Sequence, residues 1–214
     1  MAQRILVILG HPSADSLCAG LAQSYTDGAR AGGAEVRLLA LGTLAFDPLL
    51  RAGYRGTQPL EPDLVAAQAH IAWAEHLVWV YPVWWGAMPA LLKGFVDRVF
   101  LPGFAFRYRS GSALWDKLLA GRSAELLVTM DSPPWYYRWV QGMPGHRQMQ
   151  HTILEFSGIR PVRVRSIGPV RSADATRRAQ WLQQARQWGL RQGRRPGSPS
   201  KNDSRADASS VSSY

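Results

Sequence analysis

The chain has 214 residues, of which 46% are hydrophobic and 19% are charged, and its formal net charge is +10. This length and composition fit one domain with a large core and are short for two domains. No apolar run approaches the ~18 residues of a membrane-spanning helix, and the single cysteine, Cys18, excludes an intrachain disulfide and a cysteine-rich metal site. The chain enters its first strand without the apolar region of a signal peptide, so we expect a cytoplasmic protein.

The positive charge is spread over the body of the chain and its last segment. Residues 191–214 hold five basic and two acidic side chains and lack apolar periodicity, which predicts a disordered tail. A basic protein attracts polyphosphate cofactors, nucleic acid or anionic membrane through its long-range field. Because no nucleic-acid-binding motif accompanies the charge, we expect no specific nucleic acid as a partner. A weak contact between the basic tail and an anionic membrane is a further expectation.

Apolar runs alternate with amphipathic helical patterns along residues 1–190. This alternation predicts one α/β domain, with a five-stranded parallel sheet between two layers of helices. Right-handed crossovers limit the strand order, and the flavodoxin-like order 2-1-3-4-5 is one of two common solutions. The strands are predicted at 5–9, 35–41, 77–81, 123–130 and 161–167, and the helices at 16–33, 61–74, 88–100, 141–157 and 173–190.

The loop after the first predicted strand offers a site for an anion. Gly10–Cys18 leads into a helix, whose first amides and positive dipole end attract phosphate. The loop has neither the GxGxxG spacing of a dinucleotide fold nor the GxxxxGK[ST] spacing of a P-loop, which argues against both classes. His11 can hydrogen-bond a phosphate or satisfy the carbonyls of its own loop, and both interpretations stay open.

The most informative run is YPVWWGAMPALLKG, Tyr81–Gly94. Pro82 has no N–H to donate and can end the third strand, and Pro89 suits the first turn of the next helix. A rigid aromatic turn at the carboxyl end of a strand is where open α/β sheets bind planar ligands. Two adjacent side chains rarely share one burial direction. We therefore expect at least one of Trp84 and Trp85 to form a ligand wall, with core packing as the alternative.

The loop after the fourth predicted strand can meet the same ligand from the other side. In the predicted topology Thr129–Tyr137 lies next to the aromatic turn, and its prolines suit a preformed pocket. An aromatic lid or a subunit contact is the alternative interpretation. His146 is the other histidine in a candidate site loop. We find no Ser–His–Asp or Cys–His constellation with persuasive spacing, and no histidine–carboxylate metal cluster.

With these residues in view, the chain resembles the flavodoxin-like NAD(P)H:quinone oxidoreductases. This family includes the mammalian quinone reductases and bacterial flavoproteins that accompany potassium-efflux channels. The strongest match is YPVWWGAMPALLKGFVDRVFLPGFAF, residues 81–106. Supporting matches are LVILGHPSADSL at 6–17 and IGPVRSADATRRAQWL at 167–182. The resemblance covers about residues 4–190 and leaves the tail uncovered.

The resemblance implies a bound flavin, FMN with FAD as the alternative. NAD(P)H would reduce it, and a quinone or similar two-electron acceptor would reoxidise it in ping-pong fashion. It also implies a homodimer whose active sites include residues from both subunits. By the same resemblance, three groups of residues would surround the flavin. The phosphates and ribityl chain would lie along His11, Ser16, Leu17 and Cys18. The ring would be lined by Pro82, Val83, Trp84, Trp85 and Gly86 and faced from the fourth-strand loop by Thr129, Asp131 and Ser132.

One segment departs from the family pattern. Mammalian members have Thr-Thr-Gly-Gly after the fourth strand, where glycine amides approach the flavin, but this chain has TMDSPP at 129–134. Proline cannot donate an N–H, and Asp131 would repel a reduced, anionic flavin. The resemblance implies two catalytic residues. Tyr137 lies at the family tyrosine position. Met143 lies at the family histidine position, and His146 takes the place of that histidine if the loop is shifted. The departure raises an alternative function, a flavin-binding regulatory or accessory subunit with little turnover.

Overall fold

Five parallel strands form the central sheet of the protein. The structure is a computed structural model that describes residues 1–53, 56 and 58–197. The sheet order is β2-β1-β3-β6-β7, and every neighbouring pair is parallel. The predicted order 2-1-3-4-5 is confirmed, because β6 and β7 are the fourth and fifth strands of this sheet. Its strands are β1 (Arg4–Leu9), β2 (Glu35–Ala40), β3 (His76–Pro82), β6 (Ser123–Thr129) and β7 (Val162–Ile167).

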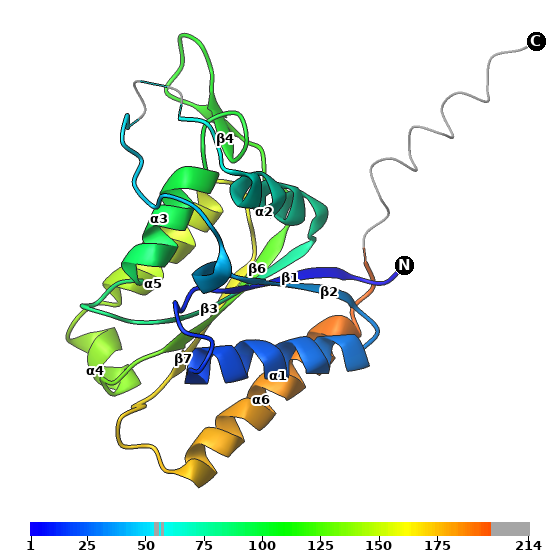
Figure 1. Ribbon diagram of the computed structural model, residues 1–214, viewed down its shortest axis with the longest axis vertical. Helices are drawn as coiled ribbons and strands as arrows, with labels where there is room; N and C mark the ends of the chain where they lie inside the picture. Colours follow the sequence, from blue (N-terminus) through cyan, green and yellow to red (C-terminus); the bar gives the residue numbers. More distant parts are fainter. Residues whose placement is uncertain (54–55, 57, 198–214) are drawn as a thin grey trace, which may run out of the picture.

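Two layers of helices cover the sheet (Figure 1). On one face α1 and α6 pack together against β1 and β3, and on the other face α2, α3 and the π-helix η2 enclose a second apolar cluster. Because both faces are covered, the central strands are apolar throughout, and all seven residues of β3 are buried. The helices are α1 (Leu17–Ala31), α2 (Pro62–Trp73), α3 (Ala90–Val99), α4 (Pro134–Trp139), α5 (Pro144–Arg147), η2 (Gln148–Glu155) and α6 (Ala175–Gly193), with a 3₁₀ turn η1 (Leu41–Thr43) after β2.

Glycines allow α1 and α6 to approach closely. A Cβ built at Gly28 of α1 would lie 2.0 Å from the Arg186 carbonyl oxygen, and one at Gly189 of α6 would lie 2.1 Å from the Tyr25 carbonyl oxygen. No side chain fits at these distances, so the backbones are in direct contact. This contact fixes the position of α1, whose first turn faces the edge where β1 and β3 end.

The structure differs from the sequence prediction in several elements. A short antiparallel hairpin, β4 (Phe106–Tyr108) and β5 (Trp115–Lys117), lies where no strand is predicted. The helix predicted at 141–157 begins only at Pro144 and continues as the π-helix η2, because Gly142 and Met143 adopt left-handed backbone conformations. The last helix continues to Gly193, past the predicted boundary at residue 190, and residues 198–214 of the predicted tail lie outside the described residues.

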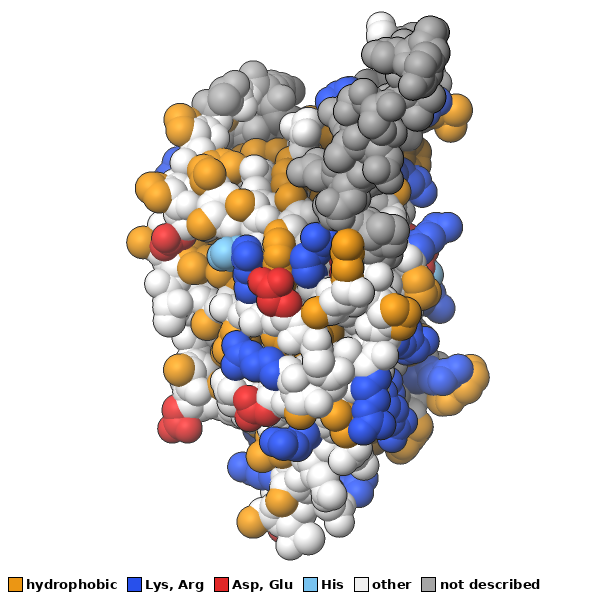
Figure 2. All heavy atoms as spheres, turned by 90° about the vertical axis from the view of Figure 1, so that its right-hand side faces the viewer, with side chains coloured by type: hydrophobic (Ala, Val, Ile, Leu, Met, Phe, Trp, Pro, Cys, Tyr) orange, Lys and Arg blue, Asp and Glu red, His pale blue; other side chains and the backbone are white. Residues whose placement is uncertain are grey.

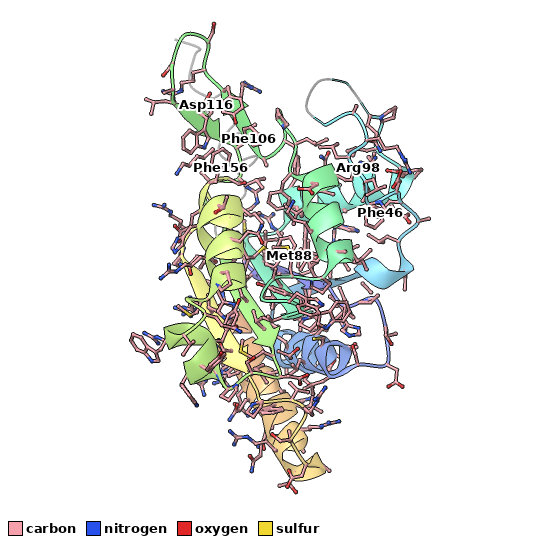
Figure 3. The ribbon with its side chains drawn as sticks, turned by 90° about the vertical axis from the view of Figure 1, so that its left-hand side faces the viewer. Phe46, Met88, Arg98, Phe106, Asp116 and Phe156 are labelled. Atoms are coloured by element: carbon pink, nitrogen blue, oxygen red, sulfur yellow. The ribbon has the colours of Figure 1, made fainter. Side chains whose placement is uncertain are left out.

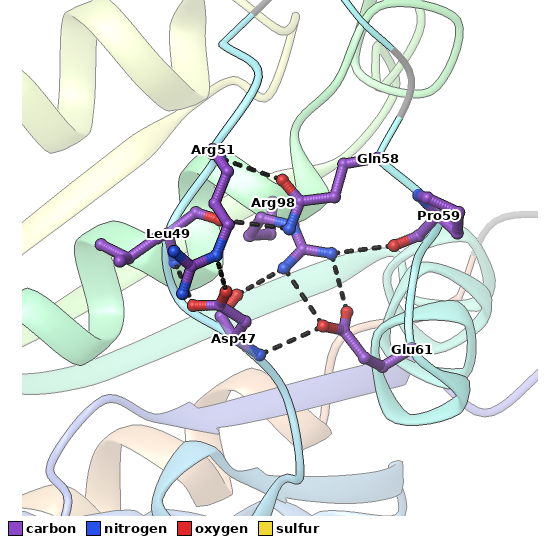
Figure 4. A network of polar contacts seen from close by, with 7 residues as sticks. All are labelled: Asp47, Leu49, Arg51, Gln58, Pro59, Glu61 and Arg98. Atoms are coloured by element: carbon purple, nitrogen blue, oxygen red, sulfur yellow. Dashed lines mark hydrogen bonds and ion pairs between the residues drawn. The ribbon is translucent and has the colours of Figure 1, made fainter.

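A buried arginine ties the connection after β2 to α3 (Figure 4). The Arg98 side chain is fully buried, and its guanidinium lies 2.7 Å from Glu61 Oε2. It also donates to the carbonyl oxygens of Asp47 and Pro59. Gly94, one turn earlier in α3, leaves no room for a Cβ against Pro48. The hydrogen bonds and the ion pair of the Arg98 guanidinium thus hold this connection in place.

Basic side chains dominate the face that carries the amino terminus. Figure 2 shows Lys and Arg side chains gathered over its lower half, where α1 and α6 lie, with few acidic side chains among them. This distribution agrees with the net charge of +10. None of the helices in the described part of the chain is long and apolar enough to cross a bilayer.

We predict that Glu61→Gln destabilises the fold through Arg98. The substitution keeps the shape of the side chain but leaves a buried guanidinium without its countercharge, which costs about 3 kcal/mol of unfolding free energy. Urea denaturation followed by circular dichroism measures this loss.

The matched control for this substitution is Asp97→Asn. Asp97 pairs with Lys93 at 2.7 Å on the same helix, but both side chains are partly exposed, so its loss should cost only about 0.5 kcal/mol. Equal losses in the two variants would show that burial of Arg98 does not matter.

Candidate functional site

The carboxyl ends of β1, β3 and β6 meet at a cavity. Parallel neighbours end at the same edge of a sheet, so the three loops that follow these strands come together there. The cavity has a volume of about 190 Å³. Its lining residues are His11, Ser16, Leu17, Cys18, Pro82, Val83, Trp84, Thr129, Met130, Asp131 and Val170.

Hydrogen bonds within the loop after β1 determine its shape. His11 Nδ1 lies 3.0 Å from the Ser13 amide nitrogen and 3.1 Å from the Ser13 carbonyl oxygen. The Ser16 hydroxyl caps α1 by accepting from the Ala19 amide and donates to the Ser13 carbonyl. Because Ser16 is the N-cap, the N–H groups of the first helical turn point toward the cavity edge. A capped helix amino terminus therefore lies at the cavity edge, and anion binding there remains a prediction.

Cys18 joins the first helical turn to the end of β6. Its Sγ lies 3.2 Å from Thr129 Oγ1, and both side chains are buried. Burial raises the pKa of the thiol to about 11, so Cys18 stays protonated at neutral pH. The contact makes Cys18 a packing residue of the cavity wall and gives it no nucleophilic character.

The aromatic turn after β3 is a two-residue hairpin. Trp84 and Ala87 exchange hydrogen bonds of 2.9 and 3.0 Å, and the two residues between them, Trp85 and Gly86, have φ angles of 51° and 79°. Such a turn needs positive φ at both central positions, which is common for glycine and rare for tryptophan. The strain at Trp85 is an outlier of the kind that accompanies ligand sites.

The turn presents its polar and aromatic groups to the outside. In the described part of the chain the N–H groups of Trp85 and Gly86 have no hydrogen-bond partner. The Trp85 indole is fully exposed, whereas Trp84 is half-exposed and packs edge-on against the His11 ring at 5.5 Å. Neither indole is buried, which argues against the core-packing alternative, and a ligand-wall role for either remains a prediction. Unpaired amides and an exposed aromatic wall make this turn suited to a planar, hydrogen-bonding ring.

The loop after β6 is tied to the segment after β7 through its carboxylate. Asp131 accepts a hydrogen bond from the Arg171 amide at 3.0 Å, which ties the loop to the segment after β7. Pro133 and Pro134 then begin the short helix α4. Ser132 does not line the cavity, although Thr129 and Asp131 do.

Tyr137 connects the two loops of the site through its hydroxyl group. The side chain is buried, its hydroxyl donates to the Gly86 carbonyl at 2.9 Å, and it accepts from the Gly145 amide at 2.9 Å. Burial raises the pKa of the phenol above its ordinary value. A hydroxyl engaged in this way holds the aromatic turn in place. A catalytic role for Tyr137 remains a prediction.

His146 lies behind Tyr137 and outside the cavity. The two rings are 4.9 Å apart, and His146 Nε2 lies 2.9 Å from Ser166 Oγ. Burial lowers the pKa of His146 to about 4, so the ring is neutral at physiological pH. The predicted catalytic pair is therefore in contact, but His146 does not line the same cavity as Trp84. Its catalytic role also remains a prediction.

Most of the predicted cofactor residues come together around the cavity. The exceptions are Ser132, and Trp85 and Gly86, which form the rim of the turn. Sequence reasoning missed Met130 and Val170. Val170 lies within the supporting motif at 167–182, which could have indicated it. No group of three potential metal-ligating side chains occurs among the described residues.

The fold agrees with comparisons to known proteins. Residues 3–189 match a sequence family described as having a flavodoxin-like fold. The chain belongs to this flavodoxin-like family. Its relatives include the rat NAD(P)H dehydrogenase [quinone] 1, which is 26% identical over 195 residues, covering 78% of this chain and 70% of the rat protein. The predicted resemblance to NAD(P)H:quinone oxidoreductases is thus confirmed.

Two further comparisons support the flavodoxin-like assignment. A ribosyldihydronicotinamide dehydrogenase-like protein of Penicillium crustosum is 33% identical over 110 residues, covering 46% of this chain and 41% of that protein. The chain thus spans less than half of this relative, and the match alone does not transfer its activity. The structure of a putative quinone reductase from Klebsiella pneumoniae superimposes with a TM-score of 0.70 at 26% identity, covering 88% of this chain and 84% of that one.

We predict that Tyr137→Phe loosens the link between the two loops. The substitution removes the oxygen that bridges the Gly86 carbonyl and the Gly145 amide, but these two backbone groups also bond each other at 3.0 Å, so the unfolding free energy should fall by about 1 kcal/mol. Tyr136→Phe is the matched control, because its partly exposed hydroxyl makes no hydrogen bond to the described residues. Denaturation midpoints compare the two variants, and an equally stable Tyr137→Phe would refute the linking role.

Proposed function

We propose that the protein is a flavin-dependent NAD(P)H oxidoreductase that reduces quinones or related two-electron acceptors. The observation that carries this proposal is the turn Trp84–Ala87, with its strained Trp85 and its unpaired amides, beside the amino terminus of α1. These groups suit the two ends of one ligand, a planar ring and a phosphate. The confirmed family supports the same ligand class.

The chain's residues divide the work of holding such a ligand. The capped first turn of α1 would bind the phosphate, the half-exposed face of Trp84 would contact the ring, and the Trp85 and Gly86 amides would donate to its polar edge. When bound, the flavin supplies the hydride chemistry. Tyr137 would keep the turn in position through the Gly86 carbonyl. Because one cavity would serve both substrates, the proposal includes a ping-pong order.

The proposal names FMN, with FAD as its alternative. The α1 amino terminus is one phosphate site, which matches the single phosphate of FMN. The carboxylate of Asp131, which lines the same cavity, disfavours a second phosphate close by. A cytoplasmic location remains part of the proposal.

We further propose that the protein is a homodimer. A groove of about 680 Å³ lies between α3, η2 and the β4–β5 hairpin, and its lining combines aromatic and aliphatic side chains with polar ones, among them the Lys93–Asp97 ion pair. Phe106 of the hairpin and Phe156 lie close together (Figure 3), and their ring centroids are 5.1 Å apart. Tyr108, next to them, is 66% exposed. An apolar groove bordered by an exposed aromatic suits a second copy of the chain.

We predict that Tyr108→Glu weakens the dimer. A carboxylate placed in an apolar interface costs desolvation energy, so the dimer dissociation constant should rise by about 10-fold or more. Sedimentation velocity over a range of concentrations measures it. Leu114→Glu, at an exposed position of the same hairpin but outside the groove, is the control. A monomeric wild-type chain would refute the dimer.

The central test of the proposal is flavin binding. We expect the purified protein to be yellow, to release FMN on denaturation, and to oxidise NAD(P)H in the presence of a quinone. Trp84→Ala should weaken flavin affinity roughly 3- to 10-fold, since one aromatic contact contributes 0.5–1.5 kcal/mol. Fluorescence titration measures the affinity, with Leu114→Ala as the control. A chain that takes up neither FMN nor FAD would refute the proposal.

A second candidate function is a flavin-binding regulatory subunit with little turnover. The two prolines after Ser132 and the full engagement of the Tyr137 hydroxyl favour it, because both remove donors that the family uses near the flavin. Steady-state NADH and NADPH oxidation separates the two candidates, since brisk turnover excludes this one. The proposed contact of the tail with anionic membrane concerns residues largely outside the described part of the chain.

A further inference from the structure

A second and larger cavity lies beside the flavin-site loop. It has a volume of about 710 Å³ and lies between α4, the first turns of α5 and η2, and the outer half of β7. Cavities of this size hold drug-sized ligands. None of the residues that line the first cavity lines this one. The proposed flavin site therefore does not account for the second cavity.

The lining of the second cavity is positively charged. Arg138 of α4 and Arg147 of α5 both line it, and neither guanidinium forms an ion pair within the described residues. No carboxylate is among the lining residues. The side chain of Glu155, farther along η2, is already paired with His151 and Arg160. Two unpaired arginines in a concave site are suited to bind anionic oxygens, phosphate above all.

Two indoles flank these arginines. Trp135 and Trp139 line the cavity from α4 and are 63% and 75% exposed. The Arg138 guanidinium lies 5.0 Å from the centroid of the Trp139 ring, so charge and aromatic surface are adjacent. Exposed tryptophans are costly on a surface without a ligand or partner. An aromatic base can stack on an indole while the neighbouring arginine holds its phosphate.

The floor of the cavity is polar and fixed. Ser166 of β7 lines it, and its hydroxyl is hydrogen-bonded to the buried His146 ring at 2.9 Å. This hydroxyl can also bond a ring nitrogen or an exocyclic amine. The site therefore combines groups for an aromatic heterocycle with groups for phosphate, the two parts of an adenosine phosphate.

The two cavities share one loop. Along the loop after β6, Asp131 is the last residue that lines the first cavity, and Pro134 is the first residue that lines the second. Three residues of chain span at most about 11 Å, so the lining of one site begins close to where that of the other ends. Tyr137 and His146 continue the connection, since Tyr137 contacts Gly86 of the aromatic turn and His146 lines the second cavity. One extended ligand can occupy both sites.

We propose that the second cavity binds the phosphorylated adenosine end of the pyridine nucleotide and selects NADPH over NADH. NADPH carries a 2′-phosphate in addition to its diphosphate, which gives each of the two unpaired arginines an anionic partner. NADH leaves one arginine without a partner. This inference rests on the proposed function for its ligand, but the cavity is tested without turnover.

The first measurement is direct binding to the full chain loaded with flavin. Isothermal titration calorimetry with adenosine 2′,5′-bisphosphate and with 5′-AMP compares two phosphates with one. We expect the bisphosphate to bind about 10-fold more tightly, as for one additional charge-assisted contact. Equal affinities for the two nucleotides, or no binding of either, would overturn the inference.

Arginine variants locate the binding. Arg138→Gln and Arg147→Gln should each weaken bisphosphate binding about 10-fold. Arg186→Gln should leave it unchanged, because Arg186 is an exposed arginine of α6, also without an ion pair, on the opposite side of the sheet. In steady state both cavity variants should raise KM for NADPH with little change in kcat, and the variant at the arginine that meets the 2′-phosphate should leave KM for NADH unchanged. Circular dichroism confirms that the variants fold.

The outcomes separate this inference from the proposed function. One outcome is a protein that has neither flavin nor turnover but binds the bisphosphate, with this binding lost in the two cavity variants. It would refute the proposed function and support nucleotide binding in the second cavity. A second outcome is a flavin-loaded, active protein whose affinity for the bisphosphate is unchanged in the Arg138 and Arg147 variants. It would overturn this inference and leave the proposed function standing. If the protein releases FAD, and the bisphosphate binds only after the flavin is removed, the cavity serves the flavin's own adenosine and the NADPH assignment is overturned.

Discussion

The parallel pairing of β3 with β1 and β6 is the constraint on which the rest of the structure depends. All seven residues of β3 are buried, and its hydrogen bonds to both neighbours leave no freedom of register. Because parallel strands end at the same edge, the loops after β1, β3 and β6 must meet. Every feature of the candidate site follows from that meeting, from the cap of α1 to the strained turn.

A few polar side chains hold those loops once the sheet has placed them. Arg98 organises the connection after β2 from inside the core, and Tyr137 bonds the aromatic turn to the start of α5. Both act at a distance along the chain, because each joins backbone groups that have no partner within their own segment. A buried polar group must be satisfied, and here that requirement fixes loop positions that apolar packing would leave variable.

The short helix α4 divides the active edge into two regions. On its inner side Tyr137 supports the turn that would face a flavin, and on its outer side Trp135 and Arg138 line the larger cavity. Pro133 and Pro134 begin this helix.

The sequence by itself determined the sheet, its strand order and the ligand edge. Long apolar runs, right-handed crossovers and the Tyr81–Gly94 motif act locally or through general topology, so they can be recognised along the chain. Only the tertiary structure decided that the Tyr137 hydroxyl is engaged, that His146 lies outside the first cavity, and that Arg138 faces a second one. The break in the helix predicted at 141–157 belongs to the same group, since left-handed Met143 leaves no pattern in the sequence. Each of these depends on contacts between segments, and such contacts exist only after the sheet has brought the segments together.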